Sequence, residues 1–287
     1  MRDIAQEVAE LVDDGVVEVT LLGQNVNSYG RDLEGTPLFS KLLRTLDTIP
    51  GLERVWFTSP HPKDFRIDTV EAMAECRTVC EHIHLPLQSG SDQVLRRMKR
   101  AYSRRRYLEK VEMVRAAIPG VAITTDIIVG FPGETEEDFV QTLEVVEAAR
   151  YDAAYTFQYS PRPMTEAADF EGQIPKAVVQ ERFERLVEVQ QRISLEQNQR
   201  SVGRVEEVVV EGPSKKDESR LTGRTRTNKL VHFASDGAES GSFRIVRVTA
   251  AHPHYLDGEP TGEGRDRVRG GRLTLPMAAA QTGCAAC

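Results

Sequence analysis

The sequence predicts two folded domains: a partial (β/α) barrel of the α/β class over residues 1–200, and a small all-β barrel over residues 201–275. Up to residue 160, short runs rich in β-branched residues alternate with segments of helical periodicity, which is typical of parallel strands joined by helices. Beyond residue 200, short apolar runs are separated by glycine and proline, which is typical of small barrels or sandwiches. Residues 276–287 are small and polar, and we expect them to form a disordered tail.

The α/β domain is expected to contain five strands, each preceded by a helix. The first segment, residues 3–14, has apolar residues at helical spacing and ends at Gly15. The strands are expected at residues 16–22, 54–58, 82–87, 121–129 and 153–159. The intervening helices are expected at residues 38–46, 67–76, 92–117 and 136–149. Because the sequence starts on a helix, we expect the barrel to lack its first strand.

A long helix is expected to lead from the first domain into the second. From Pro175 onward the period stays helical, and one face collects the side chains of Phe183, Leu186, Val187, Gln190 and Ile193. The strands of the small barrel are expected at residues 205–211, 220–224, 230–233 and 242–249.

The composition is that of an ordinary water-soluble protein, with 40% hydrophobic and 28% charged residues. No apolar run is long enough to span a bilayer, and the amino terminus has no signal-peptide core, so we expect a cytoplasmic location. The net charge of −7 argues against a uniformly basic, general nucleic-acid-binding surface. Local charge is uneven, however, and local patches decide which partners bind.

The four cysteines predict no disulfide framework and no metal site. Cys76 and Cys80 fall in an expected helix, whereas Cys284 and Cys287 fall in the expected tail. Their number alone would allow a four-cysteine zinc site. We do not expect one, because one pair lies in the tail and no turn between the two cysteines of the other pair would bring them together around a metal.

The loops that follow four of the expected strands are rich in glycine, amides and hydroxyls. Ligands of parallel βα folds bind at the carboxyl ends of strands, and loops with few charges suit a zwitterionic, ribose-bearing ligand better than a bare phosphate. Any one loop alone is more simply a turn or a helix cap, as Thr135 and Asp138 indicate for the last one. Together the four loops favour a binding site, with the candidates Gly23, Gln24, Asn25, Gln88, Ser89, Gly130 and Glu134.

Two segments are strongly basic in this acidic chain. Residues 96–106 contain seven basic residues and no acidic one, and Arg97, Lys99 and Arg100 are weaker candidates for nucleic-acid contact. A solvated helix face is the alternative interpretation of this segment. Residues 212–232 contain six basic residues against two acidic ones, and few aromatic residues accompany them, so contact with an RNA backbone is favoured over base stacking. The RNA-binding candidates are Lys215, Lys216, Arg224, Thr225, Asn228 and Lys229.

Several motifs, in order along nearly all of residues 1–275, resemble the radical-SAM methylthiotransferase family. They lie at residues 18–29, 57–62, 82–91, 124–138 and 159–163. Residues 211–216 and 221–228 resemble the family's terminal TRAM domain, a small RNA-binding β-barrel. Residues 23–27 and 58–62 are most similar to the branch that acts on N6-isopentenyladenosine in tRNA. The resemblance therefore implies methylthiolation at C2 of that nucleoside, next to the anticodon.

The resemblance also implies cofactors and partners: S-adenosylmethionine, two [4Fe–4S] clusters, tRNA and an electron-donor protein. In the family, a Cys-x-x-x-Cys-x-x-Cys loop after the first barrel strand holds the radical-SAM cluster. Neither cluster's cysteine set occurs in this sequence, so we expect an amino-terminally truncated chain that is inactive alone, from either an incomplete gene model or a split gene. In the case of a split gene, a separate amino-terminal half would be its partner. No catalytic residue is assigned. The alternatives are a non-catalytic tRNA-binding protein that uses the TRAM domain alone, and an unrelated small-molecule barrel enzyme.

Overall fold

The computed structural model describes residues 1–58 and 60–267, so the predicted tail at 276–287 lies outside the described residues. In chain order, the α/β part consists of α1 (Arg2–Asp13), β1 (Glu18–Leu21), η1 (Val26–Ser28), α2 (Arg31–Glu34), α3 (Phe39–Asp47), β2 (Arg54–Phe57), α4 (Ile67–Glu75), β3 (His82–His84), α5 (Asp92–Arg97), α6 (Arg104–Ala117), β4 (Ala122–Val129), α7 (Glu136–Ala149), β5 (Ala153–Gln158), η2 (Glu166–Asp169) and α8 (Lys176–Gln199). The second part consists of β6 (Val205–Pro213), β7 (Arg220–Thr225), β8 (Leu230–Ala234), β9 (Phe243–Ala251) and β10 (Leu256–Arg265). Within these ranges, no helix combines the length and apolar content that crossing a lipid bilayer requires.

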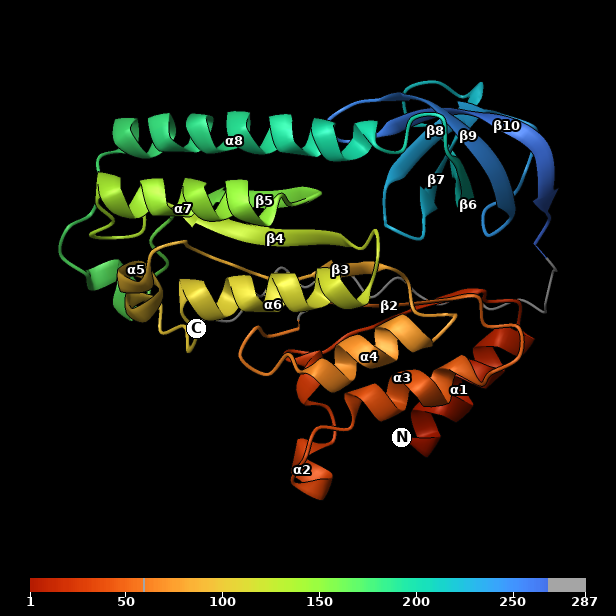
Figure 1. Ribbon diagram of the computed structural model, residues 1–287, viewed down its shortest axis with the longest axis horizontal. Coiled ribbons are helices and arrows are strands. Elements are labelled where there is room, and N and C mark those ends of the chain that lie inside the picture. The colour runs from red at the N-terminus through yellow and green to blue at the C-terminus, as the bar shows by residue number, and fades with distance from the viewer. Residues whose placement is uncertain (59, 268–287) are drawn as a thin grey trace.

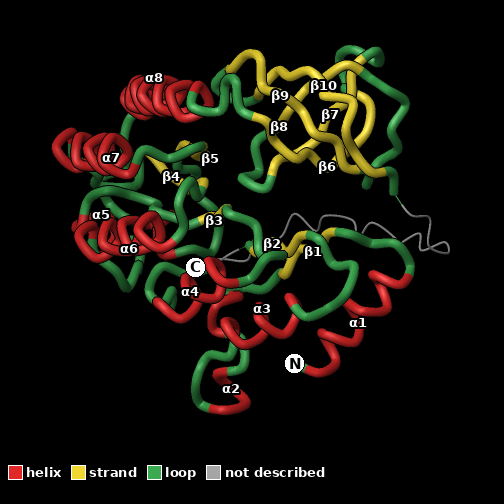
Figure 2. Tube along the Cα trace, turned by 45° about the vertical axis from the view of Figure 1, so that its right-hand side comes forward, coloured by secondary structure: helices red, strands yellow, loops and turns green. Residues whose placement is uncertain are grey.

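Strand pairing in the α/β part is parallel, as the alternation of strands and helices predicts. β1 pairs with β2, and β4 lies between β3 and β5. A single bridge between Val55 and Val79 links the two sheets, so the strands follow one another around an arc without forming one continuous ladder. The helices lie along the outer side of this arc (Figure 2).

Side chains alternate between the two faces of the strands, and this alternation separates the core from a polar inner face. Ile83 and Ile127 point outward beneath the helices and are fully buried, whereas their neighbours His84 and Asp126 are only partly buried. The apolar face of α3 packs against the same outer side, where the ring of Phe39 meets that of Phe57 edge-on at a centroid distance of 5.1 Å. The hydrophobic core therefore lies between strands and helices, and the inner face of the strands keeps the polar groups.

The second part is a closed barrel with the strand order β10-β8-β7-β6-β9, which confirms the expected all-β barrel. Its last strand, β10, was not predicted from the sequence, because it contains glycine and proline where a strand normally has β-branched residues. Gly258 in β10 is required by close packing, since an added Cβ would lie 2.4 Å from Cγ1 of Val246. Gly258 thus makes β10 hard to predict from the sequence, but its lack of a side chain is what allows the strand to pack in the closed barrel.

The barrel meets the α/β part at the amino-terminal ends of the strands (Figure 1). Arg54, the first residue of β2, donates to the backbone oxygens of Arg224 (2.8 Å) and Glu207 (2.9 Å) in the barrel. Arg226 binds the carboxylate of Glu81, just before β3, at 2.8 Å. Two further cation contacts, Lys229 with Asp152 and Arg265 with Glu53, also belong to the interface.

Candidate functional site

The loops after β1 and β2 are joined by side-chain amides at the carboxyl end of the sheet. Asn25 Nδ2 donates to Asp64 Oδ2 at 2.8 Å, while Asn27 Oδ1 accepts from the backbone N–H of His61 at 2.8 Å. Asn25 Oδ1 is buried and has no hydrogen-bond partner among the described residues. Gly23 and Gln24 are exposed beside it. The predicted residues 23–25 therefore lie at the strand end, with one buried acceptor, Asn25 Oδ1, left without a partner among the described residues.

The loop after β3 is fixed against α7. Gln88 adopts a left-handed backbone with φ of 68° and is buried. Thr142 in α7 binds this loop, and its Oγ1 accepts from the N–H of Gly90 at 2.9 Å. A Cβ on Gly90 would lie 2.5 Å from backbone atoms of Gln141 and Thr142, so the loop cannot approach α7 this closely with any other residue. Ser89 is fully buried in this contact, which gives it a packing role.

The loop after β4 is held by a buried ion pair. The carboxylate of Glu134 accepts from the N–H of Gly130 at 3.2 Å and from Arg182 in α8 at 2.8 Å. Burial raises the pKa of Glu134 to about 7, although the Gly130 N–H and Arg182 both favour the charged form. The expected capping box at Thr135 and Asp138 is present. In this structure Glu134 is therefore occupied in fixing the loop to α8.

Replacing Glu134 with glutamine is expected to flatten the dependence of stability on pH between 4.5 and 7. Because the pKa of Glu134 is raised, the folded chain binds more protons than the unfolded chain in this window. The free energy of unfolding should therefore fall as pH rises, by about 1.4 kcal/mol for each unit by which the pKa is raised. Chemical denaturation at several pH values measures the slope, and equal slopes for the two proteins would contradict the assignment.

The basic segment at residues 96–106 is partly paired within the chain. Lys99 binds Glu166 at 2.7 Å, and the guanidinium of Arg97 lies over the ring of Phe170 at 5.5 Å from its centroid. Arg100 Nε is buried and has no hydrogen-bond partner within the described ranges. These contacts tie the segment to the stretch between β5 and α8 and reduce the charge available to an outside partner.

The six RNA-binding candidates fall into three groups of two. Lys215 and Lys216 are exposed, and neither side chain makes a hydrogen bond or ion pair to any described residue. Arg224 binds Glu211 at 2.6 Å and also Asn228, which brings the two ends of the turn between β7 and β8 together.

The other candidates are buried or lie at the domain interface. Thr225 is 1% exposed, so it is a core position of the barrel. Lys229 Nζ donates to Asp152 at 2.7 Å and to Asn198 at 2.8 Å. Its positive charge is thus neutralised by the α/β part.

The inner face of β3 and β4 carries a row of polar side chains in contact that the sequence interpretation missed. His82 Nε2 lies 3.3 Å from Thr124 Oγ1, which lies 3.0 Å from His84 Nδ1. His84 Nε2 in turn lies 3.3 Å from Asp126 Oδ2. The signal was present only in part, since His82 and His84 flank the apolar Ile83, whereas Thr125 breaks the alternation between Thr124 and Asp126. We refer to these four residues as the inner-face row.

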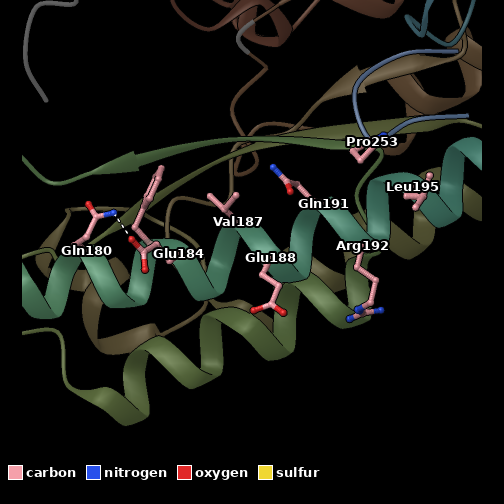
Figure 3. A pocket seen from close by; sticks show the side chains of 9 residues that line it. Gln180, Glu184, Val187, Glu188, Gln191, Arg192, Leu195 and Pro253 are labelled. Carbon is pink, nitrogen blue, oxygen red and sulfur yellow. Dashed lines mark hydrogen bonds between the residues drawn. The ribbon is translucent and has the colours of Figure 1, made fainter.

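A groove of about 460 Å³ runs along α8 and reaches Pro253 in the loop between β9 and β10 (Figure 3). Val187 and Leu195 supply apolar surface to it, and Glu184 and Glu188 supply carboxylates. Two carboxylates with one arginine, Arg192, disfavour a phosphate-bearing ligand here.

The described cysteines do not fit an iron–sulfur cluster. The predicted helical position of this pair is wrong: α4 ends at Glu75, Cys76 has an extended backbone, and Cys80 lies between the bridge at Val79 and β3. Burial raises the pKa of Cys76 to about 11 and that of Cys80 to about 12, whereas a metal ligand is a thiolate. No group of three or more His, Cys, Asp or Glu suited to a metal occurs in the described part of the chain. Cys284 and Cys287 lie outside it.

Comparison with known proteins assigns both parts of the chain. The model of the radical SAM superfamily matches residues 1–146, and that of the TRAM domain matches residues 199–261. A Leifsonia xyli subsp. xyli protein named tRNA-2-methylthio-N(6)-dimethylallyladenosine synthase is 55% identical over 274 residues, covering 93% of this chain and 51% of that protein. A protein of the same name from Streptomyces coelicolor is 58% identical over 259 residues, covering 88% and 51%. The chain thus spans about half the length of the curated relatives it matches.

A solved structure agrees with the fold. Coproporphyrinogen III oxidase from Escherichia coli, a radical SAM enzyme, superimposes with a TM-score of 0.50 over 79% of this chain and 61% of its own, at 12% identity. At this identity the likeness shows the fold alone. With the family match over residues 1–146 and the parallel strand arc, it follows that the chain belongs to the radical SAM superfamily and carries a TRAM domain.

Proposed function

We propose that this chain is part of an enzyme that modifies tRNA by radical-SAM chemistry, adding a methylthio group at C2 of N6-isopentenyladenosine next to the anticodon. The observation that carries the proposal is the 55% and 58% identity, across both domains, to relatives named for this activity. The docked TRAM barrel supports it, because a fixed RNA-binding domain beside a (β/α) barrel suits a macromolecular substrate better than a small one.

Membership of the radical SAM superfamily implies S-adenosylmethionine and a [4Fe–4S] cluster, which together supply a 5′-deoxyadenosyl radical. We place S-adenosylmethionine at the carboxyl ends of the strands, against Gly23, Gln24, Asn25 and Gln88. The buried, unpaired Oδ1 of Asn25 supports this placement. Ser89, Gly130 and Glu134 would act by shaping their loops.

The described residues offer no set of ligands that could hold a cluster. For the complete enzyme we propose two [4Fe–4S] clusters, an electron-donor protein and a separate amino-terminal segment that brings the cysteines. A cytoplasmic location, where tRNA is found, belongs to the same proposal.

The proposal predicts that Lys215→Glu combined with Lys216→Glu weakens tRNA binding and its dependence on salt. Each lysine that contacts a phosphate releases about one counterion, so the slope of log affinity against log salt should fall by about 2. Filter binding or anisotropy over a salt series measures it.

A matched control combines Lys41→Glu on α3 with Lys176→Glu on α8. Both lysines are also exposed and lie outside the TRAM barrel. The control makes the same change in net charge and should leave the slope nearly unchanged. If the two double variants changed the salt slope equally, Lys215 and Lys216 would not be part of the RNA-binding site. Arg224, Thr225, Asn228 and Lys229 would then still be explained by their contacts within the chain.

The activity is tested in the source organism by deleting the gene and analysing tRNA nucleosides by mass spectrometry. We expect the 2-methylthio nucleoside to disappear and N6-isopentenyladenosine to accumulate, and both changes to reverse when the gene is restored. An unchanged nucleoside profile, together with tRNA binding by the purified chain, would instead establish a non-catalytic RNA-binding protein.

A further inference from the structure

We propose that the inner face of β3, β4 and β5 holds the target base, and that Asp126 selects it by accepting a hydrogen bond from an exocyclic N–H group. Tyr155 and Phe157 would pack against the flat ring and its apolar substituent. This inference rests on the proposed function and adds to it a place and a discriminating residue for the base.

Two neighbouring aromatic side chains lie on this face with much of their surface exposed. Tyr155 is 57% exposed and Phe157 is 51% exposed, although both belong to a regular strand. The register pairs Tyr155 with Asp126 and Phe157 with Ile128, so all four point to the same side of the sheet. Adjacent exposed aromatic residues are a common platform for bases in proteins that bind nucleic acids, because every base presents a flat π-face.

The inner-face row fixes the hydrogen-bonding role of Asp126. His84 Nε2 lies 3.3 Å from Asp126 Oδ2, and because a carboxylate has no proton to donate, the N–H of His84 faces it. His84 Nδ1 must then accept from the Thr124 hydroxyl, whose oxygen in turn accepts from His82 Nε2. Burial lowers the pKa of His82 to about 3, so this ring is neutral and has a single N–H to donate. Every donor in the row points toward Asp126.

The row leaves one oxygen of Asp126 for a ligand. Oδ2 faces His84 Nε2 at 3.3 Å, whereas no described residue donates a hydrogen bond to Oδ1, and the side chain is 28% exposed. A carboxylate held in this way can accept a hydrogen bond from the secondary amine of an N6-substituted adenine. It would reject a base whose exocyclic nitrogen carries no hydrogen, because the acceptor would be desolvated without a partner.

The same face begins where the TRAM barrel docks. Lys229 binds Asp152 immediately before β5, three positions before Tyr155. Arg224 and Lys229 are both close enough to lower the pKa of His82 further. The proposed base site therefore lies between the domain to which we assign RNA binding and the predicted cofactor loops, since Gln88 in one of these loops donates its backbone N–H to the carbonyl oxygen of Asp126 at 2.8 Å.

The chain contains a built-in reporter for this site. Trp56, its sole tryptophan, shares the inner side with His82, and the two rings meet edge-on at 5.7 Å. Its Nε1 is buried and has no hydrogen-bond partner among the described residues. A base that enters beside the inner-face row should change the emission of Trp56.

The experiment titrates the 287-residue chain with anticodon stem-loop RNAs and follows both anisotropy of the RNA and emission of Trp56. One RNA carries N6-isopentenyladenosine, and a second carries N6-isopentenyl-N6-methyladenosine, which keeps the apolar substituent but lacks the exocyclic N–H. We expect the first to bind about tenfold more tightly than the second, the difference that one satisfied polar group makes. The first should also change the emission of Trp56.

Variants test each role. Asp126→Ala should abolish the preference between the two RNAs, and Asp126→Asn, which keeps the shape, should reduce it. Tyr155→Leu should weaken both RNAs by about tenfold while keeping the preference, since it removes stacking only. His84 is a positioning residue: His84→Ala should reduce the preference, and His84→Gln, whose amide can donate to Asp126, should restore part of it.

The outcomes separate this inference from the proposed function. Binding that depends on Lys215 and Lys216 but shows no preference between the RNAs, or no change in Trp56 emission, would overturn the inference and leave the function standing. Absence of any RNA binding would overturn the proposed function itself. A preference retained in both Asp126 variants would show that another residue reads the base.

Discussion

Replacement of Arg54 by methionine is expected to lower the free energy of unfolding by about 3 kcal/mol, because it removes a buried cation from the contact between the two domains. The Arg54 side chain is 0% exposed and binds the carboxylate of Glu207 at 3.3 Å. Its two terminal nitrogens also satisfy two backbone oxygens of the barrel, on Arg224 and Glu207. Methionine fills a similar volume but leaves both oxygens buried without a donor.

Arg265 provides the matched control for Arg54. It also binds Glu207, at 3.5 Å, but its side chain is 49% exposed and its main partner is Glu53 at 2.6 Å. Arg265→Met should therefore cost only about 1 kcal/mol. Urea denaturation followed by the fluorescence of Trp56, two residues from Arg54, measures both variants. If the two variants lost similar free energies of unfolding, burial of Arg54 would not be what makes it important for docking.

Arg182→Met should have an effect of similar size, also about 3 kcal/mol, in the loop after β4. Arg182 and Glu134 form an ion pair in which the two side chains are 6% and 2% exposed. Without the guanidinium, Glu134 would keep the N–H of Gly130 but lose its cationic partner. The pKa of Glu134, already raised by burial, should rise further, so the loss should be greatest at high pH.

Arg185 lies one turn along α8 and tests whether burial is the cause. It shares Glu136 with Arg182, yet it is 38% exposed, so Arg185→Met should cost about 0.5 kcal/mol. Adding Glu134→Gln to Arg182→Met should recover part of the lost stability, because no buried charge then lacks a partner. If the double variant is no more stable than Arg182→Met, the charge of Glu134 is not what makes the arginine necessary.

The parts of the fold that depend on local spacing were predictable from the sequence. A run rich in β-branched residues predicted β4, and Thr135 with Asp138 indicated the start of α7. β10 was not predictable in this way, since its glycines are explained only by strands that become neighbours on folding. For the same reason α4 was extended by one residue to Cys76, where no local signal marks the end of the helix.

The candidate site was predictable only in part. The order of strands and helices identified the loops at the strand ends, because the carboxyl ends of parallel strands lie at the same edge of a sheet. It could not show that Glu134 is bound by Arg182, 48 positions away, or that Lys229 is bound by Asp152, 77 positions away. A count of basic residues therefore overstated the charge that the barrel offers to RNA. The inner-face row was predictable only in part, because His82 and His84 flank the apolar Ile83 but Thr125 breaks the alternation in β4.

The contact between the two domains has a consequence for engineering by domain exchange. A TRAM barrel transplanted from a relative would meet Arg54, Glu81 and Asp152, whose partners are backbone oxygens, Arg226 and Lys229 of the present barrel. The barrel of a chimera should therefore dock on the α/β part only when the contact residues of both domains come from the same parent or are exchanged as matched pairs. A crossover within the linker should therefore give a functional chimera only if the paired residues on both sides of the domain contact are exchanged with it.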